Sequence, residues 1–257
     1  MSTKAIILAG GYGTRLSEET IVKPKPMVKI GNHPILWHIM KIYSCHGIKD
    51  FVIALGYKGN LIKDYFINYH YYANNFTLNA SDSNIEIHSK SVEDWKITFL
   101  DTGENTMTGG RIKKAMEFIG HERVLVTYGD GLADIDINKL IRFHEKQGKK
   151  ATLTAVRPPS RFGDVIFEGD VVTKFHEKPQ SGDGWINGGF FVLEPEVANC
   201  IEGDEMPFEE EPLSHLTSIS ELVAYKHNGF WQPMDTIREK DILNDYWNTG
   251  SAPWKIW

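Results

Sequence analysis

Short apolar runs alternate with stretches of helical periodicity along most of the chain. An apolar run between turn residues is typical of a buried strand, whereas apolar residues spaced three and four apart indicate one buried face of a helix. Strands are predicted at 5–8, 51–55, 85–88, 97–100, 124–128, 149–156, 190–193 and 222–226, and helices at 34–43, 61–66, from 112 onward, 137–145, 196–202, 212–219 and 237–247. This order predicts an α/β protein with a Rossmann-like, mostly parallel sheet flanked by helices.

Two segments depart from this rhythm. Val165–Phe167 and Val171–Phe175 flank a polar turn, which predicts an antiparallel hairpin added to the parallel sheet. Residues 69–84, rich in Tyr, Asn, Ser and Asp, predict an excursion from a single domain that covers 1–257. The aromatic residues of this excursion fit a subunit contact about as well as a loop packed on itself. Together with the Trp-rich tail at 254–257, they lead us to expect a homo-oligomer.

The strongest chemical signal follows the first predicted strand. The apolar run stops at Gly10-Gly11, where the backbone must turn tightly. Backbone N–H groups at these residues and at Gly13 can approach a phosphate closely. Positive charge in the same loop comes from Arg15, Lys23 and Lys25. The combination predicts a site for a polyphosphate.

Two familiar phosphate loops do not fit this stretch. A Walker A loop requires GxxxxGK[ST], which follows neither Gly10 nor Gly11. A dinucleotide-binding loop requires GxGxxG at the start of a helix, but the run 11–16 lacks the third glycine, and Pro24 and Pro26 block a helix over 23–27. The acidic residue expected after the second strand is also missing. An NAD-dependent oxidoreductase is therefore disfavoured.

The composition narrows the function classes further. At 257 residues and 41% hydrophobic content, the chain is long enough for one large α/β domain with a proper core. The net charge of −6, without a basic tract or a long apolar run, argues against nucleic-acid and membrane-surface binding. The run at 5–8 is too short for a signal-peptide core, and no cleavage-like segment follows it, so we expect a cytoplasmic protein.

Two later stretches suit a nucleotide and a metal ion. Residues 101–111 place small hydroxyl residues and paired glycines before a helix, where donors are available to a ligand. An ordinary helix start explains these residues nearly as well, but Arg111 is basic where the helix dipole prefers acids, which favours ligand contact. Asp130 follows a buried strand between two glycines and suits Mg²⁺ that shares its ligands with substrate phosphates. Asp134 and Asp136 are expected to cap the next helix.

The first loop resembles the signature of the sugar-1-phosphate nucleotidylyltransferases. In that family GGxGTRL precedes a lysine in a proline-flanked segment, and here these are residues 10–16 and Lys25 within 23–27. A glycine turn with solvated cations explains the glycines but not the joint pattern. Further motifs in the family order are TGGR at 108–111, INGGFFV at 186–192 and FWQPMDT at 230–236. The resemblance spans Lys4 to Asp235 and implies the nucleotide-diphospho-sugar transferase type of fold.

The resemblance also implies a role for individual residues. Arg15 is expected to hold the β and γ phosphates of the nucleotide, and Lys25 the reacting phosphates. Asp130 and Asp235 are expected to bind one Mg²⁺, although Asp235 is also placed to cap the helix at 237–247. The residues expected to bind the nucleotide are Leu8, Ala9, Gly10, Gly11, Tyr12, Gly13, Thr14, Thr106, Gly110, Arg111 and Gly129.

A sugar-binding part is expected within 157–235. The resemblance implies that Glu177 accepts hydrogen bonds from sugar hydroxyls and that Lys178 contacts the phosphate; a surface charge pair is the competing explanation. Asn187 is available to sugar hydroxyls, and Gly188 lets a sugar lie against the backbone. A strand bulge accounts for one glycine here better than for two.

The likeness is closest to family members that join CTP and α-D-glucose 1-phosphate, giving CDP-glucose and pyrophosphate, a first step toward the dideoxy sugars of bacterial O-antigen lipopolysaccharide. Use of UTP or dTTP stays open, because cytosine presents a donor where uracil presents an acceptor, and the sequence does not show which atoms face the base. A non-catalytic nucleotide-sugar sensor of the same fold is a further alternative. The presence of Lys25, Asp130 and Asp235 disfavours it.

Overall fold

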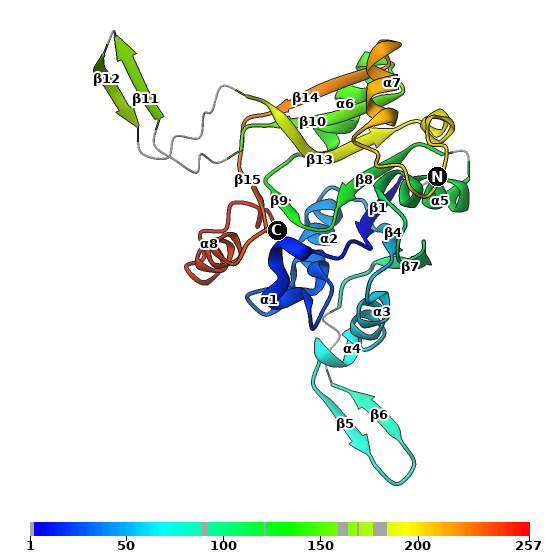
Figure 1. The fold of residues 1–257 in the computed structure, drawn as a ribbon. Helices are drawn as coiled ribbons and strands as arrows, with labels where there is room; N and C mark the ends of the chain where they lie inside the picture. Colours follow the sequence, from blue (N-terminus) through cyan, green and yellow to red (C-terminus); the bar gives the residue numbers. More distant parts are fainter. Residues whose placement is uncertain (1–2, 89–91, 121, 159–163, 169, 177–183) are drawn as a thin grey trace.

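A central sheet of seven strands organises the protein (Figure 1). The computed structural model describes residues 3–88, 92–120, 122–158, 164–168, 170–176 and 184–257. The strands lie in the order β14 (Leu222–His227), β10 (Ala151–Val156), β13 (Ile186–Leu193), β8 (Val124–Tyr128), β1 (Lys4–Ala9), β4 (Asp50–Leu55) and β7 (Lys96–Asp101). Only β13 runs antiparallel to its neighbours in this sheet. The expected Rossmann-like, mostly parallel sheet is confirmed.

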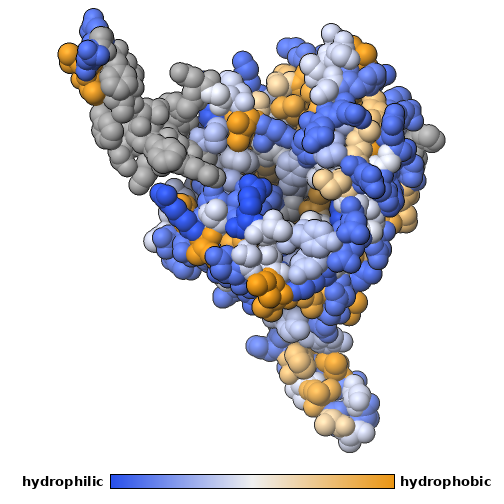
Figure 2. All heavy atoms as spheres, in the orientation of Figure 1, coloured by the Kyte–Doolittle hydropathy of each residue, from blue (hydrophilic) through white to orange (hydrophobic). Residues whose placement is uncertain are grey.

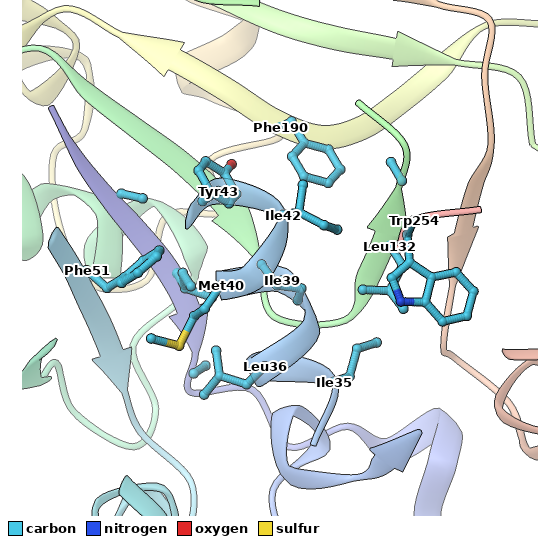
Figure 3. Packing of buried hydrophobic residues seen from close by; sticks show 14 of the residues in the cluster. Ile35, Leu36, Ile39, Met40, Ile42, Tyr43, Phe51, Leu132, Phe190 and Trp254 are labelled. Carbon is cyan, nitrogen blue, oxygen red and sulfur yellow. The ribbon is translucent and has the colours of Figure 1, made fainter. Parts of the chain in front are cut away.

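Helices cover both faces of this sheet. One face packs against α2 (Ile35–Cys45), α3 (Gly59–Ile67), α6 (Ile137–Gln147) and α8 (Ile237–Asn248), and the other against α5 (Thr108–Ile119) and α7 (Glu211–Ser218). Neighbouring residues of a strand serve opposite faces: Ile7 lies in the first core and Ile6 in the second. Figure 3 shows the first core, where the apolar side of α2 meets Phe51, Phe190 and Trp254.

Four small antiparallel pairs are added to the main sheet. They are β2 (Lys29–Ile30) with β3 (His33–Pro34), β5 (Phe76–Asn79) with β6 (Asn84–Ile87), β9 (Gly131–Ala133) with β15 (Trp231–Pro233), and β11 (Asp164–Glu168) with β12 (Val171–His176). The predicted hairpin at 165–175 is confirmed. The polar excursion at 69–84 contains more structure than expected, namely α4 (Tyr69–Tyr72) and strand β5, because alternating apolar residues pair across the turn at 80–83.

Tight turns connect the strands to the helices near the carboxyl edge. The first crossover contains η1 (Thr14–Leu16), α1 (Ser17–Thr20) and η2 (Lys25–Met27). The short 3-10 turn η2 follows Pro24 and contains Pro26, and it ends after a single turn where a longer helix was excluded. The helix expected at 196–202 is instead the 3-10 helix η3 (Pro195–Cys200). Within the described ranges, every helix is too short or too polar to cross a membrane.

Candidate active site

The sheet brings distant segments together at one edge. Strands β1, β8 and β10 end there, and β13, being antiparallel, begins there. In open α/β sheets ligands bind at the carboxyl ends of the parallel strands. A cavity of about 700 Å³ lies at this edge, within the range of small-molecule sites. Its walls come from the glycine loop after β1, the segment before α5, the end of β8, the start of β13, and β15 with the residues after it.

The charged side chains of the cavity gather around Lys25. Its Nζ lies 2.6 Å from Oδ2 of Asp130 and 2.5 Å from Oδ1 of Asp235. The other carboxylate oxygen of Asp235 lies 2.8 Å from Nη1 of Arg15. The Lys25 side chain is 10% exposed, whereas that of Arg15 is 71% exposed and reaches solvent. Two cations and two carboxylates from three segments therefore meet at one point.

The two carboxylates keep Lys25 charged. Burial alone would lower the pKa of Lys25, but the negative charges of Asp130 and then Asp235 outweigh burial and raise the pKa above its ordinary value. Lys25 is therefore an ammonium at neutral pH. Lys23, expected to face the phosphates too, instead forms an ion pair with Glu19 at 2.8 Å and does not line the cavity.

The small sheet of β9 and β15 explains why Asp130 and Asp235 meet. Gly131 pairs with Pro233, and Met234 donates its N–H to the carbonyl of Asp130 at 2.8 Å. This pairing places the residue before β9 beside the residues after β15. Asp235 is not the cap of α8, because Thr236 forms the capping box with Glu239. The Asp235 carboxylate is thus left to the cavity.

Arg111 holds the loops around the cavity in place. The guanidinium is buried within reach of five oxygens, those of the carbonyls of Gly10, Leu55, Gly103 and Glu104 and of the Thr102 hydroxyl, at 2.7–3.1 Å. A Cβ at position 10 would lie 2.2 Å from its Nη1, so glycine is required there. Burial lowers the pKa of Arg111. Arg111 lines the cavity, and its contact with a nucleotide stays a prediction.

Uncharged polar groups line both ends of the cavity. Beside the glycine loop, the hydroxyl of Tyr12 donates to Oδ1 of Asn105 at 2.7 Å, and Thr106 lies close by in the same wall. On the other side of Asp130, the start of β13 contributes Asn187. These two ends are separated by β8, with the charged cluster between them. The cavity can therefore hold two polar ligands whose charged parts meet at Lys25.

The comparisons agree with this arrangement. A family model described as nucleotidyl transferase matches residues 4–248. The chain belongs to the nucleotidyl transferase family. Over 255 residues this nucleotidyl transferase is 55% identical to glucose-1-phosphate cytidylyltransferase of Salmonella typhi, with 99% of each chain covered. It is 47% identical over 256 residues to probable glucose-1-phosphate cytidylyltransferase of Bacillus subtilis, covering 99% of this chain and 100% of the relative.

The fold of this nucleotidyl transferase also matches solved structures. HddC from Yersinia pseudotuberculosis superposes with a TM-score of 0.70 at 24% identity, over 95% of this chain and 99% of the other. That likeness concerns the fold alone. The resemblance seen in the glycine loop and the later motifs is therefore confirmed at the level of family and fold.

Most residues expected at the site of the nucleotidyl transferase line the cavity. They are Leu8, Ala9, Gly10, Gly11, Tyr12, Gly13, Thr14, Arg15, Lys25, Thr106, Arg111, Gly129, Asp130, Asn187 and Asp235. Gly110 and Gly188 do not line it. Gly110 packs against Asp204, whereas Gly188 packs against Val156 and accepts a hydrogen bond from Trp231 through its carbonyl. Glu177 and Lys178 lie outside the described residues. The roles of all these residues in binding stay predictions.

Several residues that line the cavity were not among the expected site residues, and Tyr128, Glu209 and Trp231 matter most for its geometry. Tyr128 ends β8 directly before Gly129, Trp231 lies in β15, and Glu209 belongs to an acidic stretch that reads as a solvated loop. The indole N–H of Trp231 donates to the carbonyl of Gly188 at 2.8 Å, linking β15 to β13. The FWQPMDT motif contained the signal for Trp231, but Glu209 has no periodicity or motif to mark it.

The donor set of the nucleotidyl transferase fits Mg²⁺. Among the described residues no group of three or more His, Cys, Asp or Glu side chains has the arrangement of a metal site. The carboxylates of Asp130 and Asp235, however, both contact the ammonium of Lys25, so both can reach a single cation. Mg²⁺ is commonly held by one or two carboxylates together with substrate phosphates and water. The pair therefore suits a metal that arrives with a nucleotide.

Proposed function

We propose that this nucleotidyl transferase transfers a cytidylyl group from CTP to α-D-glucose 1-phosphate, giving CDP-glucose and pyrophosphate. The names of both cytidylyltransferase relatives, matched over nearly their whole length, support this substrate pair. The observation that carries the catalytic role is the meeting of Lys25 with Asp130 and Asp235 inside the cavity. A nucleotide-sugar sensor would not need a buried cation between two carboxylates. The expected cytoplasmic location stays a prediction from the sequence.

The residues of the cavity suit a reaction between two anions. A phosphate oxygen of the sugar phosphate attacks the α-phosphorus of CTP in line, and pyrophosphate leaves; catalysis then depends on positioning and on neutralising charge. Lys25 supplies a fixed ammonium for the reacting phosphates, and Arg15, exposed at the mouth, is placed for the β and γ phosphates. Asp130 and Asp235 would hold Mg²⁺, which, when bound, supplies further positive charge to the nucleotide phosphates.

The sugar and the base are assigned to opposite ends of the cavity. The glycine loop and the segment at 104–107 lie on the β4 side of β8, so we assign the nucleotide to them. Asn187 and Gly188 lie on the other side, where Glu177 and Lys178 are also expected to act. Sugar and nucleotide phosphates then meet above Gly129 and Asp130.

Initial rates with different nucleotides test the proposed function. We expect pyrophosphate release from CTP with glucose 1-phosphate and Mg²⁺, at a kcat/KM about 100-fold or more above that with UTP or dTTP, because a site built for an amino donor leaves groups unpaired with a carbonyl. Chromatography should identify CDP-glucose as the product. Preference for UTP or dTTP would replace CTP in the proposal. Tight CTP binding without pyrophosphate release from any nucleotide would favour the sensor.

We also propose that the protein forms a homo-oligomer through the β5–β6 hairpin. The hairpin extends away from the body of the protein (Figure 2). Its apolar side chains lie on one face, because Phe76 pairs with Ile87 and Leu78 pairs with Ile85. Phe76 and Leu78 are 43% and 54% exposed. A two-stranded hairpin is marginally stable alone, so this face is expected to be covered.

A second copy of the chain is the occupant that the hairpin suits. Residues 73–88 contain no Lys or Arg, so the hairpin offers nothing to attract nucleic acid or an anionic membrane. Its apolar face is nearly uncharged and can pack against the same face of another copy.

Replacing Leu78 by aspartate should therefore produce a smaller species. Light scattering after size exclusion should give a lower mass for Leu78→Asp than for the wild-type protein, because a charge is placed in an apolar contact. Replacing Asn79, on the opposite face, by aspartate is the control and should keep the wild-type mass. A wild-type monomer, or an unchanged mass for Leu78→Asp, contradicts the proposal.

A further inference from the structure

Glu209 connects the two ends of the cavity through a chain of hydrogen bonds. One of its carboxylate oxygens accepts from the hydroxyl of Tyr128, and the other accepts from Oγ1 of Thr108 at 2.6 Å. The Tyr128 oxygen in turn accepts from Nδ2 of Asn187 at 3.1 Å. Oδ1 of Asn187 accepts from the N–H of Gly189 at 2.9 Å. This series of hydrogen bonds thus links the start of α5 to the start of β13.

The carboxylate of Glu209 fixes which group donates and which accepts in each of these hydrogen bonds. An ionised carboxylate only accepts hydrogen bonds, so the hydroxyl of Tyr128 must donate its one proton to Glu209. The lone pairs of the Tyr128 oxygen are then left to accept from Asn187. The Asn187 amide is consequently held with its oxygen toward Gly189 and its nitrogen toward Tyr128. Among the described residues this nitrogen has one acceptor, so its second N–H is available to a ligand.

The surroundings hold the ring of Tyr128 in place. It lies edge-on to the ring of Phe191, with ring centroids 5.9 Å apart. The backbone of β13 packs on the ring: a Cβ at Gly189, whose φ is +80°, would lie 2.4 Å from Cδ2 of Tyr128. Tyr128, Asn187 and Glu209 all line the cavity.

We propose that Glu209 is a positioning residue for the sugar phosphate. By fixing Tyr128 and Asn187, it presents the free N–H of Asn187 as a hydrogen-bond donor to one hydroxyl of the sugar. This assignment rests on the proposed function, which places the sugar beside β13. Glu209 belongs to the acidic stretch before α7 and does not contact the sugar itself in this proposal. It determines how strongly Asn187 binds the sugar hydroxyl.

The variant Glu209→Gln tests this role because it keeps the shape and removes the charge. A glutamine amide can donate as well as accept, so Tyr128 and Asn187 lose their imposed orientation. We expect KM for glucose 1-phosphate to rise about tenfold or more, as for loss of a charge-assisted hydrogen bond, and KM for CTP to stay within about twofold. Tyr128→Phe should show the same split. The neighbouring exposed carboxylate serves as control, and Glu210→Gln should match the wild type.

Deoxy analogues of glucose 1-phosphate give a readout that general loosening of the structure would not produce. With the wild-type enzyme, removal of one particular hydroxyl should lower kcat/KM about tenfold or more. In Glu209→Gln the same removal should have little further effect, because the hydroxyl has already lost its donor. An equal rise in both KM values, an unchanged KM for glucose 1-phosphate, or full retention of the analogue discrimination would overturn the inference.

Failure of the proposed function is seen separately, with the wild-type enzyme alone. If it prefers another sugar 1-phosphate, the comparison of Glu209→Gln with Glu210→Gln is made on that substrate. If it turns over none, calorimetric binding of glucose 1-phosphate to the two variants decides the role of Glu209. Equal affinity of these variants would then contradict it.

Discussion

Replacing Lys25 by methionine should lower kcat for CDP-glucose formation by about 100-fold or more while leaving the fold intact. Methionine keeps an apolar stem of similar length in the buried site but has no charge to offer the reacting phosphates. The steady-state rate at saturating CTP, glucose 1-phosphate and Mg²⁺ measures the effect, and the far-UV circular dichroism checks the fold. Activity near that of the wild type would remove Lys25 from the mechanism.

The same variant should also reveal the electrostatic role of Lys25 in the metal-free protein. Without the ammonium, the charges of Asp130 and Asp235 repel each other, and Asp235 is left with its ion pair to the exposed Arg15. Removing one partner of a buried ion pair is strongly destabilising. We expect the Tm in EDTA to fall by about 5 °C or more. Added Mg²⁺ should raise the Tm of the variant more than that of the wild type, since the carboxylates no longer have their own cation.

Lys23→Met is the matched control for both measurements. Lys23 lies two residues away in the same loop, but it pairs with Glu19 and does not line the cavity. Glu19 keeps its ion pair with Lys240 in the variant, so the loss of Lys23 should cost little stability. The control should therefore keep kcat within about twofold and show the wild-type response of Tm to Mg²⁺. A loss as large as that of Lys25→Met would point to a general effect of charge in the loop.

The sequence predicted the centre of the site because its signals are local. Gly10, Gly11 and Gly13 stand beside Arg15 and Lys25, and one short loop is enough to carry them to the end of β1. The alternation of apolar runs with helical periodicity likewise predicted the main sheet, since buried strands and amphipathic helices are the elements with the clearest patterns. The convergence of Asp130 and Asp235 was expected from the family resemblance.

The parts that were missed depend on contacts between distant segments. Strands β9 and β15 have three residues each, too few to show a period, yet their pairing aligns the two carboxylates. The oxygens around Arg111 come from three separate segments, so no local pattern shows how its guanidinium is used. Glu209 reaches the cavity only because the stretch before α7 packs against the start of α5, where Phe208 donates to Thr108.

Replacing Asp235 by asparagine should separate metal binding from helix capping. Asparagine keeps one oxygen, which can accept from either Lys25 or Arg15, but it removes one of the two charges placed for Mg²⁺. We expect kcat to fall about 100-fold or more and the Mg²⁺ concentration for half-maximal rate to rise about tenfold or more. Binding of Mn²⁺ in the presence of CTP, followed by electron paramagnetic resonance, should weaken in parallel.

The neighbouring residue supplies the contrast. Because Thr236 and Glu239 cap α8, Thr236→Ala should lower the free energy of unfolding by about 1 kcal/mol and leave the Mg²⁺ requirement unchanged. Asp235→Asn should do the reverse, with a small change in stability and a large change in metal dependence. If Asp235→Asn instead behaves like Thr236→Ala, its carboxylate serves the helix rather than the metal. Among the described residues in contact with Lys25, Asp130 would then be the one carboxylate placed to bind a metal ion.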